Sequence, residues 1–211
     1  MHIPPTHALE TRFIPAQQAS TRLAIVLHGL GDSMEGFAFL PQFLAIPWLN
    51  YLLVNAPNPY FTGYAWYDID NPTTGILESR EKLQALFAEL DAARSPTQDR
   101  ILSGFSQGCL MSIDFALRYD KPLAGIIGIS GYAAFLSRLA TETTEQARKQ
   151  AWLITHGTVD ELLPLERTRA QMEQIKAVGV PLEWHEFHKG HTLDVEDEMP
   201  LIRDWIIKRW K

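Results

Sequence analysis

Cysteine is almost absent from this 211-residue sequence, since Cys109 is the only one. A single cysteine excludes a disulfide within the chain and leaves no cysteine cluster that could hold zinc. The amino-terminal residues also lack the basic leader and apolar run of a secretory signal. A reducing compartment is compatible with both observations, and we expect the protein in the cytoplasm.

Long apolar runs are missing as well. The longest mostly apolar stretch, residues 122–136, is interrupted by Gly125, Gly128, Ser130 and Gly131. It is shorter than the roughly 20 apolar residues that a helix needs to cross a bilayer. We therefore expect no integral association with a membrane.

Basic residues are fewer than acidic ones, with 19 Lys and Arg against 25 Asp and Glu. The net charge is −6, and the 21% of residues that are charged are dispersed without a basic block that could neutralise phosphates. Nucleic acid is therefore not an expected partner. No repeat, low-complexity tract or linker divides the chain, and 46% hydrophobic residues can build a substantial core. We expect a single domain over residues 1–211.

Short apolar runs alternate with helical patterns along the chain. The runs predict strands at residues 23–27, 51–55, 101–102, 123–129, 152–155 and 182–187. Helical patterns begin near Ser33 or Met34, at Glu78, after Ser106, near Pro164 and before the carboxyl terminus. Because the apolar runs are largely unalternating, they predict a mostly parallel sheet with helices on both faces, which is an α/β fold.

The segment Gly104-Phe105-Ser106-Gln107-Gly108 has the G-x-S-x-G pattern of a nucleophile elbow. The pattern places a serine on a sharp turn between a strand and a helix, with glycines where a β-carbon would crowd its neighbours. Apolar residues precede and follow the turn at the spacings that a strand and a helix require. Taken alone, the motif fits a plain Gly-Ser turn about equally well.

Two further segments could belong to a site. The first strand runs into His28-Gly29-Leu30-Gly31-Asp32-Ser33, where the glycines let amide groups converge and a following helix would favour an anion. After the second strand, Pro57 and Pro59 predict an end to regular structure. The loop that follows is rich in aromatic residues, including Trp66 and Tyr67, and forms either a pocket wall or a packed cover.

A serine needs a base to remove its proton and a carboxylate to hold that base. Ser106, Asp160 and His191 follow in the order Ser, Asp, His that α/β hydrolases use, and each follows a predicted strand. Sites form where the strands of an open parallel sheet end. Glu161 is the rival for the acid and His188 for the base.

These residues resemble the carboxylesterase and acyl-protein thioesterase family of α/β hydrolases, also called the phospholipase/carboxylesterase group. The resemblance spans nearly the whole chain, and the motifs stand in the family's order: the segments that begin at His28, Trp66, Gly104, His156 and Gly190. It implies an α/β-hydrolase fold with a minimal cap and no metal or organic cofactor. By the same resemblance, Ser106 is the nucleophile, Asp160 the acid and His191 the base, and the amides of Leu30 and Gln107 form the oxyanion hole.

The chain departs from the family pattern at two places. Cys109 stands where a second glycine is common, and Thr192 to Glu196 replaces a Pro-Glu pair after the catalytic histidine. The departures leave the substrate open among a small acyl ester or thioester, a lysophospholipid and an acylated protein, and a homodimer is also left open. A peptidase and a non-catalytic binding protein are the alternatives. We expect Leu30, Met34, Trp66 and Tyr67 to line an apolar acyl pocket, with surface packing as the alternative for the aromatic residues.

Overall fold

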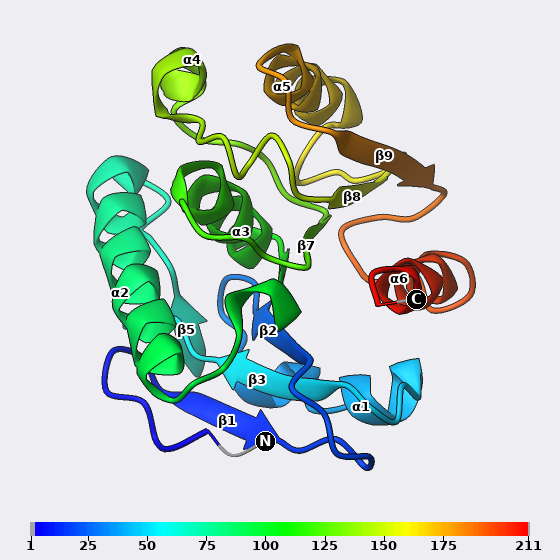
Figure 1. Ribbon diagram of the computed structural model, residues 1–211. Coiled ribbons are helices and arrows are strands. Elements are labelled where there is room, and N and C mark those ends of the chain that lie inside the picture. The colour runs from blue at the N-terminus through cyan, green and yellow to red at the C-terminus, as the bar shows by residue number, and fades with distance from the viewer. Residues whose placement is uncertain (1–2, 211) are drawn as a thin grey trace.

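The computed structural model describes residues 3–210 and contains a seven-stranded sheet in the order β1-β3-β2-β6-β7-β8-β9 (Figure 1). The strands are β1 (Thr11–Ile14), β2 (Leu23–Leu27), β3 (Asn50–Val54), β6 (Arg100–Phe105), β7 (Gly125–Ile129), β8 (Trp152–Gly157) and β9 (Leu182–Phe187). All neighbouring pairs are parallel except β1 with β3. The mostly parallel sheet and six of its strands were predicted from the apolar runs.

Helices cover both faces of the sheet. The α-helices are α1 (Leu40–Leu44), α2 (Pro72–Ala92), α3 (Gln107–Arg118), α4 (Leu139–Glu142), α5 (Leu165–Ala177) and α6 (Glu198–Lys208). Buried side chains of α2, α3, α4 and α5 belong to one core cluster, and those of α1 and α6 belong to a second. The central strands are buried on both faces, which explains their continuous apolar runs.

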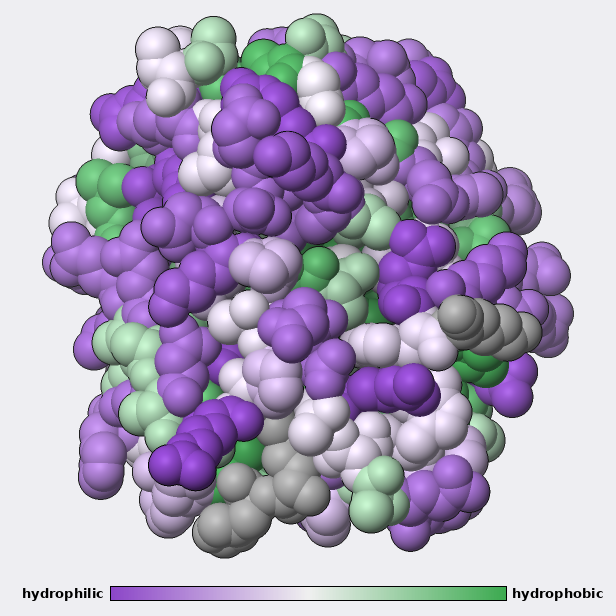
Figure 2. Space-filling view, in the orientation of Figure 1, coloured by the Kyte–Doolittle hydropathy of each residue, from purple (hydrophilic) through white to green (hydrophobic). Residues whose placement is uncertain are grey.

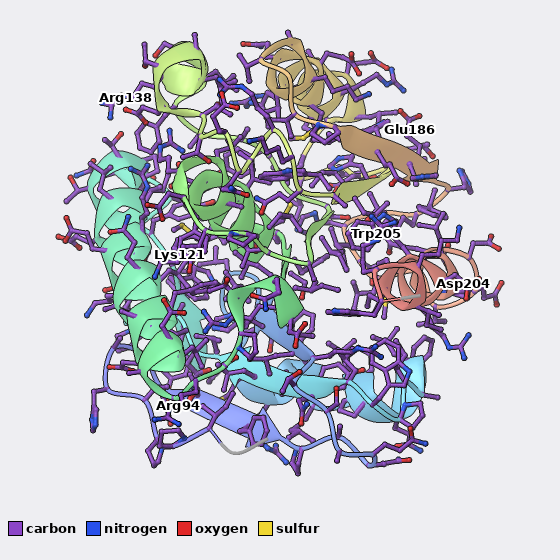
Figure 3. All side chains as sticks on the ribbon, viewed as in Figure 1. Arg94, Lys121, Arg138, Glu186, Asp204 and Trp205 are labelled. Atoms are coloured by element: carbon purple, nitrogen blue, oxygen red, sulfur yellow. The ribbon has the colours of Figure 1, made fainter. Side chains whose placement is uncertain are left out.

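The carboxyl-terminal helix shows how the sequence pattern determines a buried face. Ile202, Trp205 and Ile206 of α6 are buried, as their spacing predicted. In Figure 3, Trp205 lies between α6 and β9, whereas Asp204 points away from the molecule. The Trp205 indole Nε1 donates a hydrogen bond to Glu183 of β9 at 3.1 Å. The helix is thereby tied to the edge of the sheet.

One strand was missed, and two local expectations were wrong. The amino-terminal strand β1 was not predicted, because its four residues are only partly buried at the edge of the sheet. The helix expected at Ser33 is a single 3₁₀ turn, η1 (Met34–Phe37), so no long helix lends its positive end there. The helix α2 begins at Pro72 and not at Glu78, since its first turn packs against Tyr67 and proline is tolerated at that position.

The aromatic loop contains a hairpin instead of irregular structure. Its strands β4 (Asn58–Tyr60) and β5 (Gly63–Ala65) pair in antiparallel fashion. Pro59 is accommodated because this ribbon has only two strands, so a residue without an N–H can face outward. Tyr64 exchanges backbone hydrogen bonds of 2.9 Å with Gly31 and Asp32. The hairpin is therefore attached to the Gly-rich turn that follows β2.

Figure 2 shows a face covered mainly by hydrophilic residues, with hydrophobic ones in small separate groups. Within residues 3–210, no helix combines the length and the apolar character needed to cross a bilayer.

Candidate active site

Three side chains from distant parts of the chain form one hydrogen-bonded series. His191 Nε2 lies 2.8 Å from Ser106 Oγ, and His191 Nδ1 lies 2.8 Å from Asp160 Oδ2. Ser106 follows β6, Asp160 follows β8 and His191 follows β9. The carboxyl ends of these parallel strands lie at one edge of the sheet, where sites of open α/β sheets form. The arrangement can pass a proton from the serine hydroxyl to an imidazole held by a carboxylate.

The turn at Ser106 has the strained geometry of an elbow. Ser106 has φ 56° and ψ −116°, a conformation that L-residues rarely adopt. A β-carbon at Gly104 would overlap the backbone of Gly108, and one at Gly108 would overlap the carbonyl of Leu27. Both glycines are therefore required by the close contact among β6, α3 and β2.

Asp160 is held as an anion inside the protein. Its side chain is fully buried. Burial opposes ionisation, but the backbone N–H of Leu163 and the imidazole of His191 donate hydrogen bonds to the carboxylate and lower the pKa of Asp160 overall. The N–H of Leu162 also donates, at 3.0 Å. Asp160 is consequently ionised at neutral pH and can fix the imidazole tautomer with the proton on Nδ1.

The rival residues lie elsewhere. Glu161 is exposed to solvent, and His188 is an exposed residue whose Nδ1 lies 3.4 Å from Thr158 Oγ1. The structure brings Asp160 and His191 to Ser106 and leaves these two outside the series.

Two backbone amides near Ser106 are free to bind an oxyanion. Within residues 3–210, the N–H groups of Leu30 and Gln107 donate no hydrogen bond to another part of the protein. Gln107 is the first residue of α3, where N–H groups have no partner within the helix. Leu30 stands in the turn after β2, which pairs directly with β6. Gln107 directly follows the nucleophile, and Leu30 lies in the turn after the neighbouring strand, next to Gly29, whose backbone closely approaches Ser106.

His28 orients the peptide group that carries the Leu30 N–H. The buried His28 accepts the Ala56 N–H on Nε2 at 3.0 Å, so its proton is on Nδ1, which donates to the Gly29 carbonyl at 2.6 Å. Burial lowers the pKa of His28 and keeps it neutral, although Gly29 and Asp32 oppose the shift. Because the Gly29 carbonyl and the Leu30 N–H point in opposite directions from one peptide plane, the contact turns the N–H outward.

Comparisons with known proteins identify the family of the chain. The sequence model of the phospholipase/carboxylesterase family matches residues 10–209. The chain belongs to the phospholipase/carboxylesterase family. It shares 31% identity over 218 residues with acyl-protein thioesterase 1 of Schizosaccharomyces pombe, covering 94% of this chain and 96% of that protein. It shares 29% identity over 208 residues with a probable inactive carboxylesterase of Oryza sativa, covering 89% and 84%.

A solved relative has the same fold. The crystal structure of Arabidopsis thaliana SOBER1 is 26% identical, with a TM-score of 0.82, covering 92% of this chain and all of that one. Esterase PE8 superposes with a TM-score of 0.81 at 26% identity, covering 95% of this chain and 98% of that one. The α/β-hydrolase fold predicted from the sequence is confirmed.

Trp66 and Tyr67 do not line an open pocket in this family member, contrary to expectation. Both side chains are buried, with 0% and 1% of their surfaces exposed, so neither can meet a substrate in solvent. The Trp66 indole N–H donates to the His28 carbonyl at 2.9 Å. The Gln107 side-chain amide accepts a hydrogen bond from the backbone N–H of Trp66 at 2.9 Å and donates one to the backbone carbonyl of Tyr67 at 3.0 Å. The aromatic pair therefore supports the two segments that carry the free amides.

Sequence reasoning missed this role for the Gln107 side chain. The position of Gln107 inside the elbow pointed to its backbone amide, whereas its side-chain contacts reach residues some 40 positions earlier. Leu30 and Met34 differ from the buried aromatic residues, because both are partly exposed. They stay candidates for contact with the acyl group.

Cys109 is not a competing nucleophile. Its side chain is fully buried, and burial raises the pKa of its thiol to about 12. A β-carbon at Gly131 would overlap the Cys109 side chain. The cysteine therefore fills space beneath the elbow, next to Gly131.

Proposed function

We propose that the protein is a serine carboxylesterase or thioesterase that cleaves acyl esters or thioesters through an acyl-enzyme on Ser106. The observation that carries the proposal is the continuous series from Asp160 through His191 to Ser106, with both hydrogen bonds at 2.8 Å. The two unengaged amides of Leu30 and Gln107 supply the electrostatic stabilisation that such a reaction needs.

The first half of the reaction forms the acyl-enzyme. Ser106 Oγ attacks the acyl carbonyl while its proton moves to His191 Nε2, and the carbonyl oxygen becomes an oxyanion that accepts from the Leu30 and Gln107 amides. The intermediate collapses, the bond to the alcohol or thiol breaks, and His191 gives its proton to that leaving group. Asp160 stabilises the imidazolium but keeps its negative charge.

The second half releases the acid. Water enters where the leaving group was, and His191 Nε2 removes a proton as the water oxygen attacks the acyl carbon. The tetrahedral intermediate again places its oxyanion at the two amides. Its collapse breaks the bond to Ser106 Oγ, which recovers the proton from His191. Ester or thioester and water are thus converted into a carboxylic acid and an alcohol or thiol.

Membership of the family does not by itself establish activity, since one relative is described as a probable inactive carboxylesterase. What supports activity here is that the nucleophile, base and acid are present and in hydrogen-bonding contact. A small acyl ester is the substrate that this geometry supports without further assumptions. Lysophospholipase or acyl-protein thioesterase activity would be a more specialised form of the same reaction.

Fluorophosphonate labelling tests the nucleophile directly. We expect a single adduct, on Ser106, located by mass spectrometry of a proteolytic digest. Ser106→Ala should fold normally, take no label and lose nearly all turnover of a chromogenic short-chain ester. Label on any other residue, or turnover of a peptide but not of an ester, would contradict the proposal.

A further inference from the structure

A buried ion pair lies two residues from the catalytic base. The Lys189 ammonium lies 2.6 and 2.7 Å from the two carboxylate oxygens of Glu198, the first residue of α6. The side chains are 4% and 0% exposed. The ammonium also donates to the Thr192 carbonyl at 2.8 Å and to Ser130 Oγ at 3.0 Å. An ammonium has three protons, and here each has an acceptor.

These contacts enclose the loop that carries His191. Lys189 precedes the base and Thr192 follows it directly. Farther along the loop, the Asp194 N–H donates to the Glu198 carboxylate at 3.0 Å. One buried centre of charge therefore holds the backbone on both sides of the imidazole, which leaves little freedom to the residue between.

The same centre joins the other two parts of the site. Ser130 directly follows Ile129, the last residue of β7. The carbonyl of Ile129 accepts a hydrogen bond from the Ser106 N–H at 3.0 Å. The carbonyl of Lys189 accepts the Val159 N–H at 3.2 Å, one residue before Asp160. Lys189 thus contacts the loop of the acid directly and is linked to the turn of the nucleophile through Ser130 and the adjacent Ile129.

Stability alone does not account for this pair. Removing two charges from water is costly, and well-packed apolar residues of similar volume often replace a buried pair without loss. A hydrogen-bonded pair differs from apolar packing in its direction, since its partners hold one another at set distances and angles. A second nucleophile is excluded too: Ser130 is fully buried, and the Lys189 ammonium donates a hydrogen bond to its hydroxyl oxygen, so it cannot accept the serine proton as a base.

We propose that Lys189 and Glu198 are positioning residues that hold His191 against Ser106 through this buried contact. The inference rests on the proposed function, since it concerns the base of the same reaction. It also explains why the altered segment after His191 is compatible with an intact triad: the segment supplies Thr192 and Asp194 as partners of the pair. Replacing the pair should slow chemistry and spare substrate binding.

The test is a double variant with side chains of similar size, Lys189→Met/Glu198→Leu. A misplacement of about 1 Å costs on the order of 10²-fold in rate, so we expect kcat to fall by roughly 10- to 10²-fold and KM to change less than about twofold. The fluorophosphonate labelling rate of Ser106 should fall with kcat, because labelling needs the same base. The Thr192 carbonyl and the Asp194 N–H lose a partner, so the thermal unfolding midpoint should fall by several degrees, and circular dichroism at the assay temperature should still show the wild-type fold.

The matched control makes the same substitutions in an exposed pair on α5. Lys176 lies 2.8 Å from Glu173 there, and Lys176→Met/Glu173→Leu should leave kcat, KM and the labelling rate unchanged. A wild-type kcat in the Lys189/Glu198 variant would overturn the inference. So would a raised KM with an unchanged kcat, because that result would assign the pair to substrate binding.

If the double variant fails to fold, Ser130→Ala tests whether the buried contact positions His191. This change removes one hydrogen bond to the ammonium, so we expect kcat to fall by roughly three- to tenfold at constant KM. An unchanged kcat would then overturn the inference. The wild-type labelling rate separates the two proposals: an unlabelled wild type contradicts the hydrolase itself, whereas equal labelling of wild type and variant contradicts only the positioning role.

Discussion

Trp66→Phe tests whether the buried indole supports the oxyanion turn or lines an acyl pocket. The change removes the hydrogen bond to the buried His28 carbonyl, and an unsatisfied buried acceptor costs about 1–3 kcal/mol. The smaller ring also loses packing equivalent to roughly two methylene groups at about 0.8 kcal/mol each. We therefore expect a loss of about 3 to 4 kcal/mol in the free energy of unfolding.

The stability loss should be visible as a lower unfolding temperature. At roughly 2–4 °C per kcal/mol for a chain of this size, the midpoint should fall by on the order of 10 °C. Loss of a whole oxyanion donor costs about 10²- to 10³-fold in kcat, and a displaced donor should cost less, roughly tenfold. Measurement of kcat/KM for acetyl to dodecanoyl esters should show every substrate slowed alike.

Trp152→Phe is the matched control. Trp152 is also fully buried, and its indole N–H donates to the Ala147 carbonyl at 2.9 Å. It is the first residue of β8, however, and so lies at the amino end of the strand, away from the carboxyl end that leads to the site. It should lose similar stability at unchanged kcat. Two results would refute the reasoning: a shift of the Trp66→Phe optimum towards longer acyl chains, or an equal loss of kcat in both variants.

Three further predictions follow from the site. Asp160→Asn should cut kcat by up to ~10⁴-fold because it permits the wrong imidazole tautomer, by analogy with the serine proteases, whereas Glu161→Gln should be nearly silent in the same assay. Burial lowers the pKa values of His28 and His156, so the unfolded chain binds protons that the folded chain does not bind. Urea unfolding should therefore show full stability above about pH 6.5 and a loss of stability as the pH falls below it, and a flat profile would contradict the lowered pKa values. Gly108→Ala should abolish folding or activity, since its β-carbon would overlap the end of β2, and a fully active variant, checked by circular dichroism and ester turnover, would contradict the elbow packing.

The sequence by itself determined the sheet and the candidate triad. The apolar runs identify six of the seven strands of the main sheet because strands buried on both faces tolerate few polar residues. The elbow pattern identifies Ser106 because sterics demand glycine on both sides of it. Chain order is consistent with Asp160 and His191 but leaves Glu161 and His188 as rivals, and the family resemblance selects between them.

Only the tertiary structure decided how that triad is supported. The edge strand β1 is only partly buried, so it has no continuous apolar run, and the start of α2 at Pro72 depends on packing against Tyr67. Both depend on neighbours that no local pattern reveals. The sequence favoured a pocket wall for Trp66, but an aromatic side chain buries surface in a pocket wall and in a core alike, and only the structure shows that Trp66 is fully buried. The contacts of Gln107 and Lys189 join segments about 40 and 59 residues away, and hydrogen bonds of that range leave no periodic trace in a sequence. Their partners are chosen by the folded backbone, which brings the ends of separate strands within reach of one side chain.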